Sequence, residues 1–260
     1  MDIVADNLTI TNAIIADAVQ RMNPEPIQKL VKRCEAAGAG MIDINSGPLT
    51  RRPEELMTFL VNSVRKASNL PLLLDTSNPV ALEAGLRVCQ GKAIINGFSL
   101  EPDKLTYILP LARKFETRII GYLLYPDSNV PADGAERLTV ALELYSRFSE
   151  AGLASAQLII DPVIPPLIWQ NGHIQAVEVV NVIRTLPDLL GFKVQTIAGI
   201  SNLTTGPCDK GRKPVFEQVY TAMLAEAGLS MALVNVFHTG TMAAIRACNI
   251  LTSTKIFSWE

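Results

Sequence analysis

Short apolar runs alternate with longer segments of helical periodicity along the whole chain, and this alternation limits the fold more than any other feature. About eight of the runs are expected to be strands. They span residues 6–15 (including an exit loop), 41–45, 72–75, 93–96, 118–124, 158–163, 195–201 and 232–237. Most positions in them are apolar, which is typical of strands buried on both faces of a parallel sheet.

The segments between these runs carry signals for helices. Pro24, Pro53 and Pro79 each stand at the start of one, where the missing N–H of proline is not needed. Apolar residues then recur every three or four positions, as at Ile27 and Leu30. Further helices are expected over residues 102–111, 138–148, 174–186, 216–227 and 241–251.

A chain of 260 residues with this alternation matches a closed (β/α)8 barrel, which typically needs about 250 residues. An open, doubly wound sheet is the alternative. The chain contains neither GxGxxG nor GxxxxGK[ST], the phosphate-binding loops typical of open sheets. We therefore predict an α/β fold, a single (β/α)8 TIM-barrel domain over residues 1–260.

Composition excludes several classes of protein. Hydrophobic residues make up 48% of the chain and charged residues 18%, so a large core is expected and long disorder is not. The net charge of −2 gives no basic surface for nucleic acid. No apolar run reaches membrane-spanning length, and the acidic start MDIVADN does not resemble a signal peptide. A soluble, cytoplasmic protein that binds neither membrane nor nucleic acid is expected.

The cysteines and histidines give no sign of a metal site. Four cysteines lie far apart without a CxxC pair and are expected to be reduced, and the only two histidines are His173 and His238. Neither the cysteines nor the histidines have the spacing typical of zinc or iron ligands. With so few histidines, neither a Ser-His-Asp nor a Cys-His nucleophile is assembled from the sequence.

Carboxylate and amide side chains recur where the apolar runs end. They are Asp43, Asn45, Asp75, Asn96, Asp161 and Asn202, with Asn12 a further candidate on the first run. A single Asp after a strand is more often a helix cap or a turn residue. In a parallel barrel, however, the carboxyl ends of all strands meet at one mouth, where active sites lie. The repetition therefore predicts one polar site at that mouth.

Two kinds of ligand suit such a mouth, in which we place no Lys, His or Cys. Asp43, Asp75 and Asp161 are able to bind Mg²⁺. The alternative is a neutral heterocycle rich in N–H donors, such as an aminopyrimidinone. Its amide N–H and exocyclic amine donate together to one carboxylate, and amide side chains pair with the remaining ring atoms.

The motifs at these strand ends resemble those of a known family. MIDINSGP, LLLDTSNPVALEAGL, IINGFS, LIIDPVIPP and GISN occur in this order over nearly the whole chain. They are similar to the pterin-binding methyltransferases that exchange a methyl group between methyltetrahydrofolate and a corrinoid protein. That family is related to dihydropteroate synthase and to the folate domain of cobalamin-dependent methionine synthase. The resemblance implies a TIM-barrel enzyme, usually a homodimer, with folate as substrate and no tightly bound metal.

The resemblance also assigns roles to residues around the pterin ring. It implies that Asp75, Asn96 and Asp161 hold the ring and that Asp43 and Asn45 line the same pocket. The corrinoid is expected on a separate partner protein, because the DxHxxG motif that ligates it is absent from this chain.

The GISN motif is implied to hold the reacting end of the folate. Asn202 would hydrogen-bond around N5, the nitrogen that carries the methyl group, with Gly199 and Ser201 in contact with the substrate. An amide is a weak acid, but it can donate a hydrogen bond where charge develops in the transition state. Asn202 as a turn cap is the alternative. A basic residue follows GxSN in the family, and Arg212 or Lys213 is the candidate here.

Three rival functions are considered. Dihydropteroate synthases typically carry GxSRK where this chain reads GISNL, so the cations for a diphosphate leaving group are missing. A non-catalytic folate-binding protein would use the same pocket. A metal-dependent barrel lyase would use the aspartates as ligands.

Overall fold

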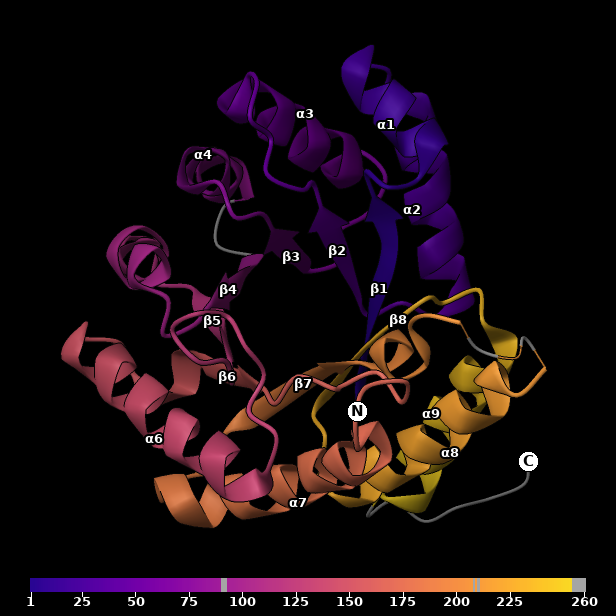
Figure 1. The fold of residues 1–260 in the computed structure, drawn as a ribbon. Helices are drawn as coiled ribbons and strands as arrows, with labels where there is room; N and C mark the ends of the chain where they lie inside the picture. The colour runs from indigo at the N-terminus through magenta and orange to yellow at the C-terminus, as the bar shows by residue number, and fades with distance from the viewer. Residues whose placement is uncertain (90–92, 208, 210, 254–260) are drawn as a thin grey trace.

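Eight parallel strands close into a barrel with helices around the outside (Figure 1). The computed structural model describes residues 1–89, 93–207, 209 and 211–253. The strands are β1 (Asp2–Thr9), β2 (Met41–Asn45), β3 (Leu72–Asp75), β4 (Ala93–Phe98), β5 (Arg118–Tyr122), β6 (Leu158–Asp161), β7 (Gln195–Gly199) and β8 (Met231–Val234). Each pairs with the next in sequence, and β8 pairs with β1. The predicted (β/α)8 barrel is confirmed.

The helices surround the barrel, and some of them begin or end at signals in their sequences. They are α1 (Ala13–Gln20), α2 (Glu25–Ala37), α3 (Pro53–Arg65), α4 (Pro79–Cys89), α5 (Leu109–Lys114), α6 (Gly134–Glu150), α7 (Gly172–Leu190), α8 (Lys213–Glu226) and α9 (Thr239–Leu251). Three short helical turns, η1 (Lys104–Ile108), η2 (Ser155–Gln157) and η3 (Ile200–Thr204), complete the connections. Pro53 starts α3, and Gly38 ends α2 with a φ of 102° that suits glycine.

The first predicted element is wrong in its bounds. Residues 6–15 were expected to be a strand and its exit loop, but β1 begins at Asp2 and Ile15 lies in α1. Asn12 does not point into the barrel mouth: its side chain accepts a hydrogen bond from the backbone N–H of Ile14 at 3.0 Å and caps α1. Helix α1 is short, with eight residues, so its cap residue Asn12 resembled one more polar residue at the end of a strand.

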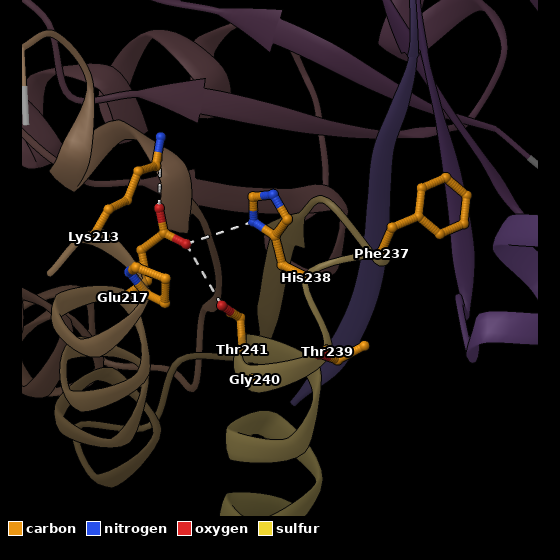
Figure 2. A pocket seen from close by; sticks show the side chains of 8 residues that line it. Lys213, Glu217, Phe237, His238, Thr239, Gly240 and Thr241 are labelled. Atoms are coloured by element: carbon orange, nitrogen blue, oxygen red, sulfur yellow. Dashed lines mark hydrogen bonds and ion pairs between the residues drawn. The ribbon is translucent and has the colours of Figure 1, made fainter. Parts of the chain in front are cut away.

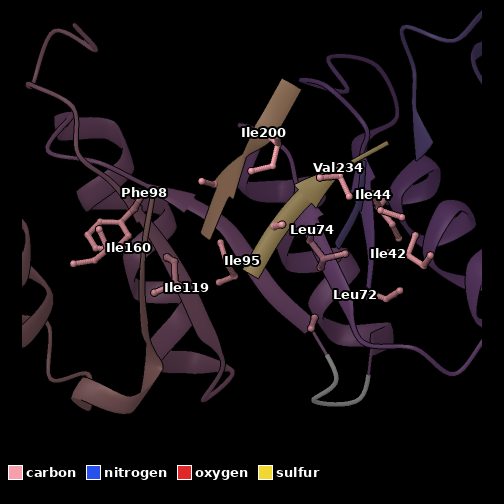
Figure 3. Packing of buried hydrophobic residues seen from close by; sticks show 14 of the residues in the cluster. Ile42, Ile44, Leu72, Leu74, Ile95, Phe98, Ile119, Ile160, Ile200 and Val234 are labelled. Carbon is pink, nitrogen blue, oxygen red and sulfur yellow. The ribbon is translucent and has the colours of Figure 1, made fainter. Parts of the chain in front are cut away.

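Alternate strand residues separate the core into two layers. Residues that face the barrel axis form an inner cluster: Val4, Met41, Leu73, Ile94, Ile120, Ile159, Ile197 and Met231. Their neighbours, such as Ile42, Leu74 and Ile160, pack between the strands and the surrounding helices (Figure 3). Burial on both faces explains why the strands read as nearly continuous apolar runs.

Cys34, Cys89 and Cys248 are buried free thiols, as expected, and Cys208 lies outside the described residues. Over the part of the chain that the structure describes, the helices are too short or too polar to cross a membrane.

Candidate functional site

A cavity of about 300 Å³ opens at the carboxyl ends of the strands. Its walls come from every strand of the barrel or from the turn that follows it. The lining residues are Asp6, Thr9, Asp43, Asn45, Asp75, Asn96, Ile120, Tyr122, Asp161, Ile197, Gly199, Ser201, Asn202 and Leu233. The predicted strand-end and GISN residues are all among them, whereas Asn12, Arg212 and Lys213 are not.

The pleat of the strands explains this convergence. Asp75 lies two residues after Leu73, Asn96 two after Ile94, and Asp161 two after Ile159. Side chains two residues apart point to the same face of a strand, so each polar group follows an apolar residue of the inner cluster into the barrel. The pairing register then brings them side by side, with Asp75 opposite Asn96.

Two hydrogen bonds hold the polar groups in fixed orientations. The amide of Asn45 donates to Oδ2 of Asp75 at 2.7 Å. The hydroxyl of Tyr122 donates to Oδ1 of Asn96, which turns the amide nitrogen of Asn96 away from Tyr122. One carboxylate oxygen of Asp75 and the amide N–H groups of Asn96 are therefore left to face a ligand.

Asp161 is held by the loop that follows β6. Its Oδ1 accepts a hydrogen bond from the backbone N–H of Val163 at 2.8 Å. Val163 has a φ of 61°, an uncommon value for a β-branched residue. The second carboxylate oxygen of Asp161 makes no hydrogen bond with another described side chain or backbone group and faces the cavity.

Four carboxyl groups crowd the cavity, and burial makes all of them weaker acids. Burial raises the pKa of Asp161 to about 7 against the lowering effects of the Val163 N–H and Arg137. It raises the pKa of Asp75 to about 6, opposed by Lys104, and the pKa of Asp6 to about 6, opposed by His238.

Asp43 is the most enclosed of these acids, with 1% of its surface exposed. Burial, with the charges of Asp75 and Asp6, raises its pKa well above the ordinary value. Within the described residues, its Oδ1 atom has no hydrogen-bond partner. A buried acceptor without a partner is costly, so a ligand N–H at this point would stabilise the site.

The GISN motif forms a turn rather than the end of a strand. β7 stops at Gly199, and η3 carries Asn202 over the cavity. Among the described residues, the Asn202 amide has no hydrogen-bond partner, so the turn-cap interpretation receives no support from a side-chain bond. A Cβ on Gly199 would lie 3.1 Å from Nδ2 of Asn202, so glycine leaves the amide its space.

A second pocket of about 440 Å³ lies between the first turns of α8 and α9 (Figure 2). Lys213, His238 and Thr241 converge there on the carboxylate of Glu217, at 3.9, 3.7 and 3.5 Å. Glu217 is 2% exposed and also accepts a 2.6 Å hydrogen bond from the hydroxyl of Thr204, the last residue of η3. It thereby ties α8 to the turn that carries Asn202.

The two candidate basic residues are placed differently. Arg212 lies outside both pocket linings, with 78% of its side chain exposed and its Nε 3.8 Å from Asp209. Lys213 lines the second pocket. Proline at the next position starts α8 earlier than the predicted residue 216, and this brings Lys213 inward.

Several residues of the site were missed from the sequence. Tyr122 follows Ile120 by two residues, a signal hidden because the strand was extended to residue 124. Asp6 was placed at the start of its strand, whereas it lies in the middle of β1. Lys104 and His238 do not line the cavity, but their charges lower the pKa of Asp75 and of Asp6 against the larger effect of burial.

The Mg²⁺ alternative finds no arrangement to support it. Across residues 1–89, 93–207, 209 and 211–253, no three His, Cys, Asp or Glu side chains are grouped as metal ligands would be.

Comparison with known proteins gives the family. Residues 7–235 match the model of the pterin binding enzymes. The chain belongs to this family. This membership confirms the resemblance found in the strand-end motifs and makes the cavity the candidate pterin site.

Individual relatives of this pterin-binding protein are distant. It is 21% identical over 255 residues to the methylcorrinoid:tetrahydrofolate methyltransferase of Eubacterium limosum, covering 96% of this chain and 91% of that protein. Dihydropteroate synthase of Xanthomonas albilineans, solved with 4-aminobenzoic acid, has a TM-score of 0.68 at 19% identity, covering 98% and 94% of the two chains. The synthase of Yersinia pestis, solved with a pterine-sulfa conjugate, has a TM-score of 0.67 at 19% identity and covers 98% and 94%. The structural likenesses show the fold.

Proposed function

We propose that this pterin-binding enzyme transfers a methyl group between a methylated corrinoid protein and N5 of tetrahydrofolate. The observation that carries the proposal is the Asn202 amide, which has no partner among the described residues and lines the candidate pterin cavity. The relative from Eubacterium limosum, named for this reaction, supports the choice within the family.

The strand ends suit the pyrimidinone edge of a pterin. One carboxylate accepts an amide N–H and the exocyclic amine together, and the described hydrogen bonds leave Asp161 and Asp75 each with an acceptor oxygen free. Asn96 offers amide N–H groups to a ring acceptor, because its oxygen already accepts from Tyr122. Asp43 supplies one further acceptor, its unpartnered Oδ1.

Asn202 would act at the reacting nitrogen. When N5 takes up the methyl group, its lone pair forms the new bond and its proton must leave. In the reverse direction N5 becomes a better leaving group only as it gains a hydrogen bond or a proton. A donor placed there stabilises the transition state more than the bound substrate, which raises the rate. Ser201 and Gly199 would shape the same wall.

Single-turnover kinetics test the proposal. Purified protein is mixed anaerobically with tetrahydrofolate and methylcobalamin, which stands in for the corrinoid protein, and methyltetrahydrofolate is quantified. Formation of methyltetrahydrofolate faster than without protein supports methyl transfer. Tight folate binding without transfer, also with a methylated corrinoid protein, would instead indicate a non-catalytic folate-binding protein.

A dihydropteroate synthase-like condensation is the second candidate, since the solved neighbours carry this name. The turn after β7 reads Ile-Ser-Asn-Leu and offers no pair of cations for a diphosphate. Incubation with a pterin diphosphate and 4-aminobenzoate separates the two functions. Product from this pair, with no methyl transfer, would overturn the proposal.

We also propose that the protein works as a homodimer with a corrinoid protein as its partner. Large apolar side chains are exposed in a stripe on the neighbouring helices α7 and α8: Ile174, Val177, Val215, Phe216, Val219 and Met223, each between 37% and 58% exposed. Such a patch is typical of an interface between subunits. Light scattering of Val219→Glu, which is expected to be monomeric, against the unmodified protein tests this.

A further inference from the structure

An arginine outside the cavity lining, Arg137, contacts the segment that follows Asp161. Arg137 lies on the inner face of α6 and is 0% exposed. Its Nη1 donates to the backbone oxygens of Pro162 and, at 3.0 Å, of Val163. These are the two residues that directly follow Asp161.

The contacts form one continuous chain from α6 to the cavity. Arg137 donates to the carbonyl of Val163, and the N–H of Val163 donates to Oδ1 of Asp161 at 2.8 Å. Val163 has the left-handed φ of 61°, which a β-branched residue keeps only when its surroundings fix it. Arg137 restrains this segment, because its Nη1 donates to both of the carbonyl oxygens.

Only one nitrogen of the Arg137 guanidinium donates hydrogen bonds in the described part of the chain. Its Nε and Nη2 atoms are buried without a hydrogen-bond partner in the described part of the chain. The acidic groups around it come from four elements: Asp161 at the end of β6, Glu178 on α7, Tyr220 on α8 and Asp133 at the N-cap of α6. The hydroxyl of Tyr220 donates to the carbonyl of Ala176 at 2.7 Å and so is already engaged.

The groups around Asp161 are Tyr122, Arg137, the backbone of Val163 and, in the same cavity, the carboxyl groups of Asp43 and Asp75. Tyr122 pairs with Asp161 across β5 and β6 and supplies no charge at neutral pH. The positive charge of Arg137 lowers the pKa of Asp161, while burial raises it to about 7. Because this pKa lies near neutral pH, loss of the Arg137 charge would change the fraction of Asp161 that is ionised at pH 7.

We infer that Arg137 is a positioning residue of the pterin site. It fixes the loop that follows β6 and keeps the Asp161 carboxyl in the ionised form that accepts the N–H groups of the pterin. The inference rests on the proposed role of this cavity in folate binding. Arg137 does not touch the substrate; it acts through Asp161.

Tetrahydrofolate binding measured by anaerobic calorimetry from pH 5.5 to 8.5 tests the inference. In the unmodified protein, affinity falls as pH drops through about 7, where Asp161 gains its proton, and falls further near 6, where Asp75 gains one. Only the first of these two steps is expected to depend on Arg137. In Arg137→Met and Arg137→Gln this fall occurs at higher pH, so that affinity at pH 7 is about tenfold lower and recovers towards pH 8.5. Arg137→Lys, which keeps the charge, stays near the unmodified pH midpoint.

Arg147→Met is the matched control, since it removes the same charge from the exposed face of the same helix. It is expected to leave the pH profile unchanged. Arg137→Gln, whose amide can still donate to one carbonyl, serves if Arg137→Met does not fold. A folded neutral variant with the unmodified pH midpoint, whether its affinity is lowered or not, would overturn the inference and leave Arg137 a fold residue. No tetrahydrofolate binding by the unmodified protein at any pH would overturn the proposed function itself.

Discussion

The two sides of the cavity are built in different ways. On one side, Asp75, Asn96 and Asp161 lie at strand ends whose backbone is fixed by the barrel ladder. On the other side, Asn202 lies on the turn η3, which leaves the barrel and depends on Glu217 of α8 through Thr204. The first side is rigid because of its strands, and the second is placed by packing between elements that are distant in sequence.

This difference suits two tasks. A pterin ring needs several hydrogen bonds of fixed direction, which strand ends supply. A donor that strengthens as charge moves on N5 must be free to reorient, and an amide on a turn without a bond from another described side chain has that freedom. We therefore expect substitutions on the strand side to change affinity and substitutions on the turn side to change rate.

The largest effect is expected for Asn202→Ala. The single-turnover rate of methyl transfer should fall by roughly a hundred- to a thousand-fold, equivalent to about 2.7–4 kcal/mol, while folate affinity changes less. Asn202→Asp should be slow at neutral pH and partly recover where its acid is protonated. Asn181→Ala, on the exposed face of α7, is the control. Equal losses of rate and affinity would remove the distinction between the two sides.

Removal of a strand-end carboxylate should come next. Asp75→Ala or Asp161→Ala removes a charge-assisted pair and should weaken tetrahydrofolate binding by about 1.5–3 kcal/mol in calorimetry. Asp17→Ala, at an exposed ion pair on α1, should bind like the unmodified protein. Unchanged affinity in both strand-end variants, with the fold intact, would show that the pterin binds elsewhere.

Glu217→Gln should weaken the attachment of η3 to α8 and leave the residues at the strand ends unchanged. It weakens the bond from Thr204 and the contacts with Lys213 and His238, so the free energy of unfolding should fall by about 1–3 kcal/mol. Methyl transfer should slow while folate affinity is retained. The control is Glu226→Gln, at an exposed ion pair on the same helix. A drop in folate affinity as large as the drop in rate would contradict the claim that η3 acts on the rate alone.

The smallest effect is the pH dependence of the ligand-free protein. Folding raises the pKa of Asp161 from 3.8 to about 7, so between these values the folded state holds a proton that the unfolded chain has lost. Stability contributed by this proton is present at low pH and is lost as pH rises through about 7. The melting temperature should therefore be a few degrees lower at pH 8 than at pH 5. Asp161→Asn should reduce that difference, and an unchanged difference would show that other groups cause it.

Much of this protein is determined by its sequence alone. The alternation of apolar runs with helical segments leads to the barrel, because strands buried on both faces need helices outside them. Side chains alternate between the two faces of a strand, so Asp75, Asn96 and Asp161 point into the mouth of the barrel. These inferences are local: they need only the spacing of residues within one strand and the direction in which it runs.

The rest was decided by the tertiary structure. No spacing in the sequence shows that Glu217 reaches Thr204, that Arg137 grips the segment after Asp161, or that Lys213 turns inward while Arg212 stays exposed. Such contacts join side chains of helices to loops elsewhere in the barrel, and their partners depend on how the helices pack. The pKa values of the buried aspartates likewise follow from burial, which exists only once the barrel has closed.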